Sequence, residues 1–113
     1  MIIQKSARTD RAFHALADPT RRKILEQLGR SEQTVMELVE QFTISQPAVT
    51  KHLNVLEDAG LISRRKTGRQ RICRAEPAGL ASAAEWMAAW SQYWNERLDG
   101  LESFLTKNQH PGN

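Results

Sequence analysis

Cysteine and histidine are scarce in this sequence, which has one cysteine and three histidines among 113 residues. A single cysteine cannot form a disulfide within the chain, and so few thiolate and imidazole ligands make a poor metal set. We therefore expect a protein of a reducing compartment with no structural zinc. Its stability must then come from packing of an apolar core.

Long apolar runs are also absent. The apolar residues lie in short runs, far below the roughly 18 uncharged positions that a membrane-spanning helix needs. The first ten residues, MIIQKSARTD, place charges directly after two isoleucines and lack the apolar region and cleavage site of a secretory signal. These features predict a cytoplasmic chain with no membrane partner.

Motifs that carry catalysis are missing too. The cysteine and the histidines form no evident pair of nucleophile and base, and no G-x-x-x-x-G-K-[ST] phosphate loop occurs. The acidic residues are not paired in a recognisable active-site motif. We expect neither an enzyme nor a cofactor.

The sequence does have the length and composition of one ordinary globular domain, residues 1–113, with 40% apolar and 26% charged residues. Within it we expect a core over about 9–75, a long C-terminal helix over about 77–107, and a tail over 108–113.

Positive charge is concentrated in the first part of the chain. Residues 1–75 carry 14 basic and 8 acidic side chains, whereas residues 76–113 carry 2 and 5. The stretch 61–75 has no acidic residue, and its basic residues are Arg64, Arg65, Lys66, Arg69, Arg71 and Arg74. A solvated surface usually intersperses both signs, so this cluster favours a polyanion such as nucleic acid as partner.

Local signals predict three short helices before residue 43. The first covers about 9–17. The second begins at Asp18 and Pro19, which suit the cap and the first turn, and Gly29 is its expected stop. The third begins at TVME, whose Thr and Glu have the spacing of a capping box.

The segment ISQPAVTKHLNVLEDAG, residues 44–60, predicts a fourth helix that Ser45 caps and Gly60 ends. One face is apolar and carries Val49, Leu53 and Leu56. The other faces carry Gln46, Ala48, Thr50, Lys51, His52 and Asn54. Its short connection to the third helix is typical of a helix-turn-helix, whose second helix can lie in a DNA major groove.

A basic hairpin is expected next, in LISRRKTGRQRICRAEP. Its turn falls at Thr67 and Gly68, and Ile62 and Ile72 are the expected inward anchors. Cys73 lies between arginines that can lower a thiol pKa, although a lone strand cysteine is usually inert.

The last helix has a seven-residue apolar repeat, and no Pro or Gly interrupts it between Leu80 and Asp99. A core of about 75 preceding residues is too small to cover it, so we expect a partner helix. Trp86, Trp90 and Trp94, at four-residue intervals, either pack in a dimer or core or line a pocket for an aromatic ligand.

Three blocks, ALADPTRRKILEQL, ISQPAVTKHLNVLEDAGLI and SRRKTGRQRICRAEP, resemble the ArsR-type winged-helix repressors of bacteria, from about Asp10 to Arg74 and more loosely beyond. The resemblance implies a mainly α fold with a small β-hairpin, a winged helix-turn-helix ordered α-α-α-α-β-β-α. It also implies a recognition helix over about Gln46–Ala59 and a dimer built from the first and last helices.

Many members of that family sense metals through a cysteine pair in the third helix or through His and acidic ligands in the last helix. Here the third-helix stretch, TVMELVEQF, has no cysteine, and no histidine lies between Pro77 and Lys107. The chain thus resembles a subgroup without the metal ligands, and we expect no metal site. A small-molecule inducer stays open.

The residues expected to contact DNA are Ser45, Gln46, Pro47, Ala48, Thr50, Lys51 and His52 in the helix and Arg64, Arg65, Lys66, Arg69 and Arg71 in the hairpin. Arg74, like Arg21 and Arg22, is expected to contact the DNA backbone or to pair internally. The residues expected in the dimer contact are Phe13, Leu80, Met87, Trp90, Trp94, Leu98, Leu101 and Leu105.

Together these features predict a homodimeric repressor that binds an inverted-repeat operator in double-stranded DNA and is not metal-sensing. The alternative is a winged-helix module that binds another protein and has weak, non-specific DNA affinity.

Overall fold

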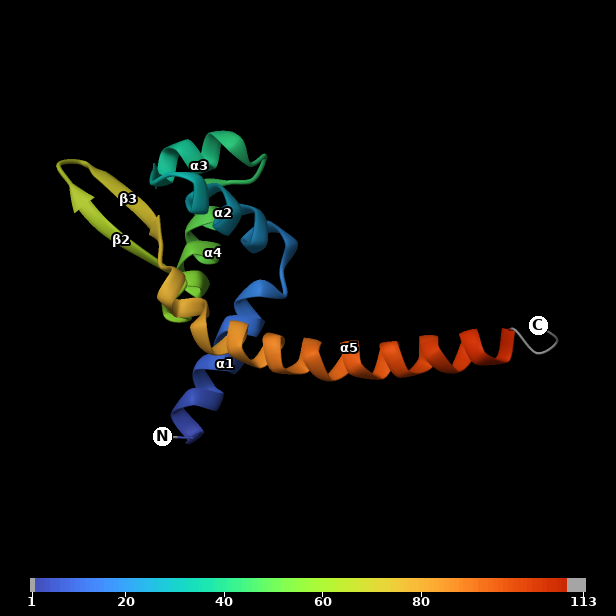
Figure 1. Cartoon of the computed structure of the whole chain (residues 1–113). Coiled ribbons are helices and arrows are strands. Elements are labelled where there is room, and N and C mark those ends of the chain that lie inside the picture. Colours follow the sequence, from blue (N-terminus) through green and yellow to red (C-terminus); the bar gives the residue numbers. More distant parts are fainter. Residues whose placement is uncertain (1, 110–113) are drawn as a thin grey trace. The chain divides into compact units, whose positions relative to one another are not determined.

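The computed structural model describes the backbone of residues 2–109 and the side chains of residues 7–106. Its elements, in chain order, are α1 (Ile2–Leu16), α2 (Pro19–Arg30), β1 (Gln33–Thr34), α3 (Val35–Gln41), α4 (Gln46–Asp58), β2 (Ile62–Thr67), β3 (Gln70–Ala75), a 3-10 helix η1 (Pro77–Leu80) and α5 (Ala81–Gln109) (Figure 1). This order confirms the predicted winged helix-turn-helix, with one short strand added.

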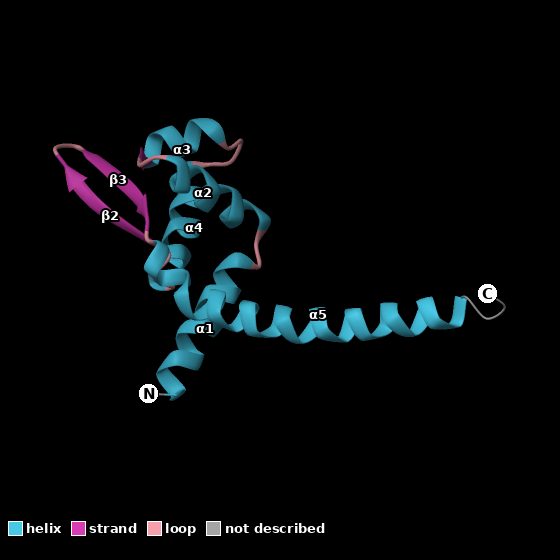
Figure 2. Ribbon diagram, in the orientation of Figure 1, coloured by secondary structure: helices cyan, strands magenta, loops and turns pink. Residues whose placement is uncertain are grey.

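The chain divides into two compact units, Met1–Ala83 and Ala84–Asn113. The first holds the helices α1 to α4 and the three strands, and the second is the continuation of α5 (Figure 2). Helix boundaries near both ends of the chain differ from expectation. Helix α1 begins seven residues earlier than predicted, and α5 continues to Gln109, while the rest of the predicted tail, 110–113, lies outside the described residues.

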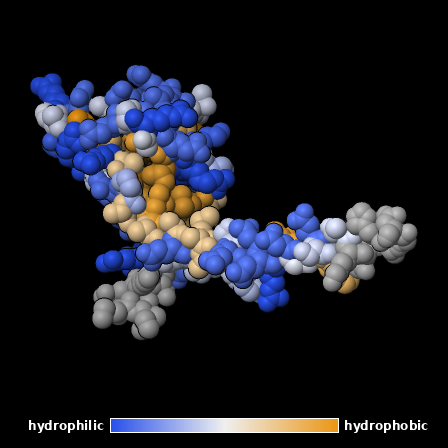
Figure 3. Space-filling view, in the orientation of Figure 1, coloured by the Kyte–Doolittle hydropathy of each residue, from blue (hydrophilic) through white to orange (hydrophobic). Residues whose placement is uncertain are grey.

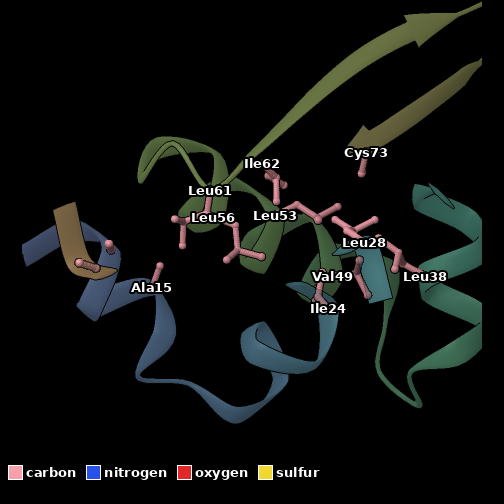
Figure 4. Packing of buried hydrophobic residues seen from close by; sticks show 12 residues of the cluster. Ala15, Ile24, Leu28, Leu38, Val49, Leu53, Leu56, Leu61, Ile62 and Cys73 are labelled. Carbon is pink, nitrogen blue, oxygen red and sulfur yellow. The ribbon is translucent and has the colours of Figure 1, made fainter. Parts of the chain in front are cut away.

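The core of the first unit forms where helices α1 to α4 meet the base of the hairpin (Figure 4). Helix α4 contributes most to it, because Val49, Leu53 and Leu56 are all fully buried, as their spacing predicts. The other buried side chains are Ala12, Ala15, Ile24, Leu28, Leu38, Leu61, Ile62, Cys73 and Ala83.

The predicted starts of α2, α3 and α4 are confirmed. The Asp18 carboxylate accepts a hydrogen bond from the Arg21 N–H at 3.0 Å, and Thr34 and Glu37 form the full capping box at the start of α3. The Ser45 hydroxyl accepts from the Ala48 N–H at 3.3 Å at the start of α4. The sequence therefore encodes these starts locally.

One predicted helix end is wrong and one is confirmed. Gly29 does not stop α2, which continues through Arg30 and is capped by the extended backbone of Ser31. Gly60 does end α4, at a positive φ of 77°. The N–H groups of Gly60 and Leu61 bond to the carbonyls of Glu57 and Leu56, the pattern of a Schellman motif.

The three strands form an antiparallel sheet in the order β1-β3-β2. Thr67 pairs with Gln70, so the two-residue loop of the hairpin is Gly68–Arg69, one residue later than predicted. Gly68 has a φ of 63°, which suits the first position of a type II′ loop.

The predicted inward anchor Ile62 is confirmed, but Ile72 is wrong, because Cys73 is the residue of β3 that the core buries. In the register of the hairpin, Ile72 lies opposite Arg65 and Cys73 lies opposite Arg64. Directly paired residues share a face and neighbours along a strand alternate, which puts Cys73 on the core face with Ile62.

Gly79 in η1 lies against the end of α4. A Cβ atom at this position would overlap the backbone carbonyl of Gly60, whereas one at Gly29 would meet nothing within 4 Å. The glycine therefore permits a close approach of two backbone segments at the base of the hairpin.

We expect Gly79→Ala to lower the free energy of unfolding by roughly 1 to 3 kcal/mol, because the backbone must move to accommodate the methyl group. The matched change Gly29→Ala should leave it unchanged or raise it by up to about 1 kcal/mol, since alanine favours the helix. Urea unfolding followed by circular dichroism measures both, and equal effects would contradict the close approach.

Candidate nucleic-acid interface

The exposed side of α4 carries polar side chains that repeat every four residues. Gln46, Thr50 and Asn54 follow one another along this side, and with Pro47 and Lys51 they line an open depression of about 400 Å³. The depression lies opposite the buried face of the same helix, so packing of the core fixes the direction in which these side chains point.

A second cavity, of about 380 Å³, lies between the start of α3, helix α4 and the hairpin. Its lining residues are Thr34, Val35, Met36, Gln46, Thr50, Arg64, Arg69, Gln70 and Arg71. Gln46 and Thr50 line both cavities, so the polar side of α4 and the hairpin form one continuous surface. Figure 3 shows that the face with α3 and the hairpin end is mostly hydrophilic.

The residues predicted to contact DNA from α4 separate into groups. Gln46, Pro47, Thr50 and Lys51 lie together in the open depression, while the Ser45 hydroxyl is used as the helix cap and Ala48 is half-buried. Asn54 belongs to the same surface and was absent from the predicted contacts. Its position four residues after Thr50 was the signal that could have found it.

His52 lies away from this surface. Its Nδ1 is 3.9 Å from the Asp18 carboxylate and 3.5 Å from the Arg21 guanidinium, at the start of α2. The Arg21 guanidinium also donates to the carbonyls of Ala15 and His14, at 2.7 and 3.0 Å. The side chain of His52, which was predicted to contact DNA, therefore faces the junction of α1, α2 and α4.

Arg22 behaves like Arg21, since it donates to the Leu16 carbonyl at 2.7 Å. The carbonyls at the end of a helix lack partners within it, and these two side chains supply donors to the end of α1. Arg21 and Arg22 were predicted either to contact the DNA backbone or to pair internally. The structure shows internal contacts, in which backbone carbonyls and not carboxylates accept the hydrogen bonds.

Arg64 connects the hairpin to α4. Its Nη2 donates to the Glu57 carboxylate and to the Asn54 side-chain carbonyl, both at 2.6 Å, and only 13% of its side chain is exposed. The hydrogen bond from Arg64 holds the pKa of Glu57 below its ordinary value. The guanidinium is therefore already engaged inside the protein.

Arg65, on the other face of β2, binds Glu32 through two hydrogen bonds of 2.6 and 3.2 Å. This paired hydrogen bonding lowers the pKa of Glu32. Arg74 lies 3.7 Å from Glu76, so of its two predicted roles the structure shows the internal ion pair.

The remaining basic residues of the hairpin are Lys66, Arg69 and Arg71. All three are exposed, and among the described residues none of them has a carboxylate within ion-pair distance. They surround the loop that joins β2 to β3. The positive charge available to a partner is thus concentrated at the end of the hairpin.

Cys73 is fully buried on the core face of β3, and burial raises the pKa of its thiol. A raised pKa disfavours the reactive thiolate, which argues against the redox role left open above.

In the part of the chain that the structure describes, no three His, Cys, Asp or Glu side chains gather into a metal-holding group. None of the described helices has the length and apolarity to span a membrane.

The residues predicted for the dimer contact differ in exposure. Phe13 and Leu80 are half-buried and pack against the core of the first unit. Along α5 the predicted side chains are 45 to 54% exposed, namely Met87, Trp90, Trp94, Leu98, Leu101 and Leu105.

The aromatic side chains of α5 contact one another. The Trp90 ring stacks on Trp86 and Tyr93, at centroid distances of 5.7 and 5.0 Å, and the Arg97 guanidinium lies 4.7 Å above the Tyr93 ring. The apolar side of α5 is thus wider than the seven-residue stripe alone.

Similarity to known proteins identifies the family of the chain. The model of the bacterial regulatory proteins of the arsR family matches residues 18–64, which run from the cap of α2 through α4 into β2. The HTH-type transcriptional regulator Rv2034 of Mycobacterium tuberculosis is 40% identical over 96 residues, 85% of this chain and 87% of that protein. The chain belongs to the ArsR family.

Two further relatives agree with this assignment. A probable mercury resistance operon repressor of Streptomyces lividans is 45% identical over 84 residues, 72% of this chain and 67% of that protein. The solved structure of an ArsR-like transcriptional regulator from Rhodococcus sp. RHA1 matches with a TM-score of 0.70 and 34% identity, over 88% of this chain and 93% of that one. ArsR-family membership makes the protein a helix-turn-helix transcriptional regulator, as the resemblance implied.

The Arg64–Glu57 pair predicts a pH-dependent contribution to stability. Because the pKa of folded Glu57 lies below its ordinary value of 4.5, the stabilisation is present above that pH and is lost as the pH falls through the lowered pKa.

We expect Glu57→Gln to lower the free energy of unfolding at pH 7 by roughly 0.5 to 1 kcal/mol, because the pair is partly exposed. The difference from wild type should shrink below about pH 4. Urea unfolding at pH 7 and at pH 3.5 measures it, with the exposed Glu40→Gln as control. A difference that is independent of pH would contradict the ion pair.

Proposed function

We propose that this ArsR-family regulator is a homodimeric repressor that binds an inverted-repeat operator in double-stranded DNA. The observation that carries the proposal is the continuous surface formed by the polar side of α4 and the unpaired cations of the hairpin. The α4 helix is of a size that the DNA major groove admits. The hairpin carries positive charge that DNA phosphates attract.

In this proposal α4 reads bases. Gln46 can form two hydrogen bonds to an adenine edge, Lys51 can donate to guanine, and Thr50 can bond to either base. Ser45, Pro47 and Ala48 lie at the start of the helix, the part that contacts base edges in helix-turn-helix proteins. Apolar contacts of Pro47 and Ala48 with thymine methyl groups would add to the readout.

The hairpin supplies charge. Lys66, Arg69 and Arg71 surround its loop and have no carboxylate partner among the described residues, so they can neutralise phosphates without breaking an internal ion pair. Arg64 and Arg65 would first have to leave Glu57 and Glu32. We therefore assign the phosphate contacts of the hairpin chiefly to the first three.

A second copy of the chain is the proposed partner of α5. This helix has 29 residues, about 44 Å, and its apolar side chains at seven-residue spacing are half exposed. An unpaired apolar surface of this length is unusual for a monomer. A symmetric dimer would present two α4 helices to successive major grooves, about 34 Å apart, of an inverted repeat.

We also propose that the regulator does not respond to a metal. The name of the Streptomyces relative links that protein to mercury resistance. Soft metals require several thiolates at fixed spacing, whereas this chain has one cysteine, which is buried and has a raised pKa.

The phosphate contacts predict a change in salt dependence. We expect the triple variant Lys66→Gln, Arg69→Gln, Arg71→Gln to bind its operator more weakly. The slope of log affinity against log salt should become shallower by about 2 to 3 for each subunit, because each lost phosphate contact removes about 0.9. Fluorescence anisotropy between 50 and 300 mM salt measures it, on an operator that wild type enriches from random duplexes.

Lys23→Gln, which changes an exposed cation of α2 outside the proposed surface, serves as control and should keep the wild-type slope. Failure of wild type to enrich any sequence would contradict an operator. Unchanged binding by the triple variant would contradict the role of the hairpin and favour the protein-interaction module.

The dimer predicts that a charge on the apolar side of α5 separates the subunits. We expect Leu98→Glu to convert the dimer into monomers. Operator binding should weaken at least 10-fold, because the α4 helix of a single subunit would have to bind one half of the operator alone. Light scattering gives the mass of each variant, and anisotropy gives its affinity.

Gln92→Glu adds the same charge on the opposite side of α5 and should keep the wild-type mass and affinity. A wild-type chain that is monomeric at micromolar concentration, or a Leu98→Glu variant that stays dimeric, would contradict the proposed contact.

A further inference from the structure

Asn54 lies on the proposed DNA surface and is hydrogen-bonded to the hairpin. It is exposed and lines the same depression as Gln46 and Thr50. Its side-chain carbonyl accepts a hydrogen bond of 2.6 Å from the Nη2 of Arg64. The hairpin therefore contacts a side chain of the reading helix directly.

That hydrogen bond determines how the amide of Asn54 is turned. A guanidinium has only donors, so the amide atom facing Arg64 must be the oxygen. The amide nitrogen, with its two N–H donors, then lies on the other side of the carboxamide group. A free asparagine could present either its donors or its acceptor to DNA, whereas this one is biased to present donors.

Glu57 holds the guanidinium in that position. The same Nη2 donates to the Glu57 carboxylate at 2.6 Å, and the Arg64 side chain is only 13% exposed. Glu57 lies three residues after Asn54 on α4, so both acceptors come from one side of the helix. A move of Arg64 to a phosphate would leave the Glu57 carboxylate without its partner.

We propose that Asn54 reads a hydrogen-bond acceptor on a base edge in the major groove through its two N–H donors, and that Arg64 is the positioning residue that orients it. The inference rests on the proposed DNA-binding function. The acceptors that fit are guanine O6 and N7, adenine N7 and thymine O4. Asn54 lies eight residues, about 12 Å along the helix, from Gln46, so it reads a different base pair.

The test compares binding at each base pair of the operator that wild type selects. Asn54→Asp keeps the oxygen that Arg64 binds and replaces the donors by a second acceptor. Asn54→Ala removes the donors without adding charge. We expect both variants to lose preference at the same single base pair, on the order of 10-fold, and to keep the preferences at the other positions.

Asn95→Asp makes the same change on an exposed residue of α5 and should preserve every preference. A uniform loss of affinity in Asn54→Ala, or an unchanged preference at all base pairs, would overturn the assignment of Asn54. A wild type that selects no operator would overturn the proposed function as well, so the two failures are distinct.

The role of Arg64 has its own readout. We expect Arg64→Met to relax preference at the same base pair as Asn54→Ala, and the double variant to relax it no further than either single change. The salt slope should stay as in wild type. A slope that becomes shallower by about 0.9 per subunit, with equal loss on all sequences, would show that Arg64 contacts phosphate and would overturn its positioning role.

Thermal unfolding of each variant controls for loss of fold. Glu57→Gln provides a milder version of the same test, because it weakens the hold on Arg64 but keeps an acceptor of the same shape. We expect a smaller relaxation at the same base pair. Relaxation at a different base pair would contradict the chain from Glu57 through Arg64 to Asn54.

Discussion

Burial of one side of α4 is the constraint on which the rest of the structure depends. Val49, Leu53 and Leu56 are fully buried among residues from α1, α2 and α3, so the helix cannot rotate without exposing them. The Schellman motif at Gly60 then turns the chain directly into β2, with Leu61 buried beside Leu56. The direction of the polar face and the position of the hairpin thus follow from one packed helix.

Charge compensation divides the basic hairpin into parts with different roles. Neighbouring residues of a strand point to opposite faces, so Arg64 meets α4 and Arg65 meets Glu32 before β1. These two ion pairs attach one face of the hairpin to α4 and the other face to the segment between α2 and β1. The cations nearer the loop have no such partner among the described residues, which makes the loop end the part suited to phosphates.

Helix α5 differs from the first unit in how far its apolar side chains are buried. Its apolar side chains repeat at helical spacing, yet they stay about half exposed, and its aromatic rings stack on one another along the helix. A helix of this kind gains most of its stability from a surface outside itself. The ArsR-like regulator from Rhodococcus shares the fold over most of its length. We propose that a second copy of the chain supplies the surface that covers α5.

The sequence by itself determined the features that depend on neighbours within four or five residues. These are the caps at Asp18, Thr34 and Ser45, the stop at Gly60, the buried side of α4 and the order of the helices and the hairpin. A cap or a helical stripe is complete within one or two turns, so its residues can be recognised without the fold.

Only the tertiary structure decided which charges are paired and which strand residue is buried. Arg65 meets a carboxylate 33 residues away, His52 meets the start of α2, and the cross-strand register selects Cys73 over Ile72 for the core. Sequence spacing holds no record of such contacts, because they form when separate elements pack. The spacing of Asn54 after Thr50 could be found in the sequence, but only the fold shows that Arg64 bonds to its side-chain carbonyl.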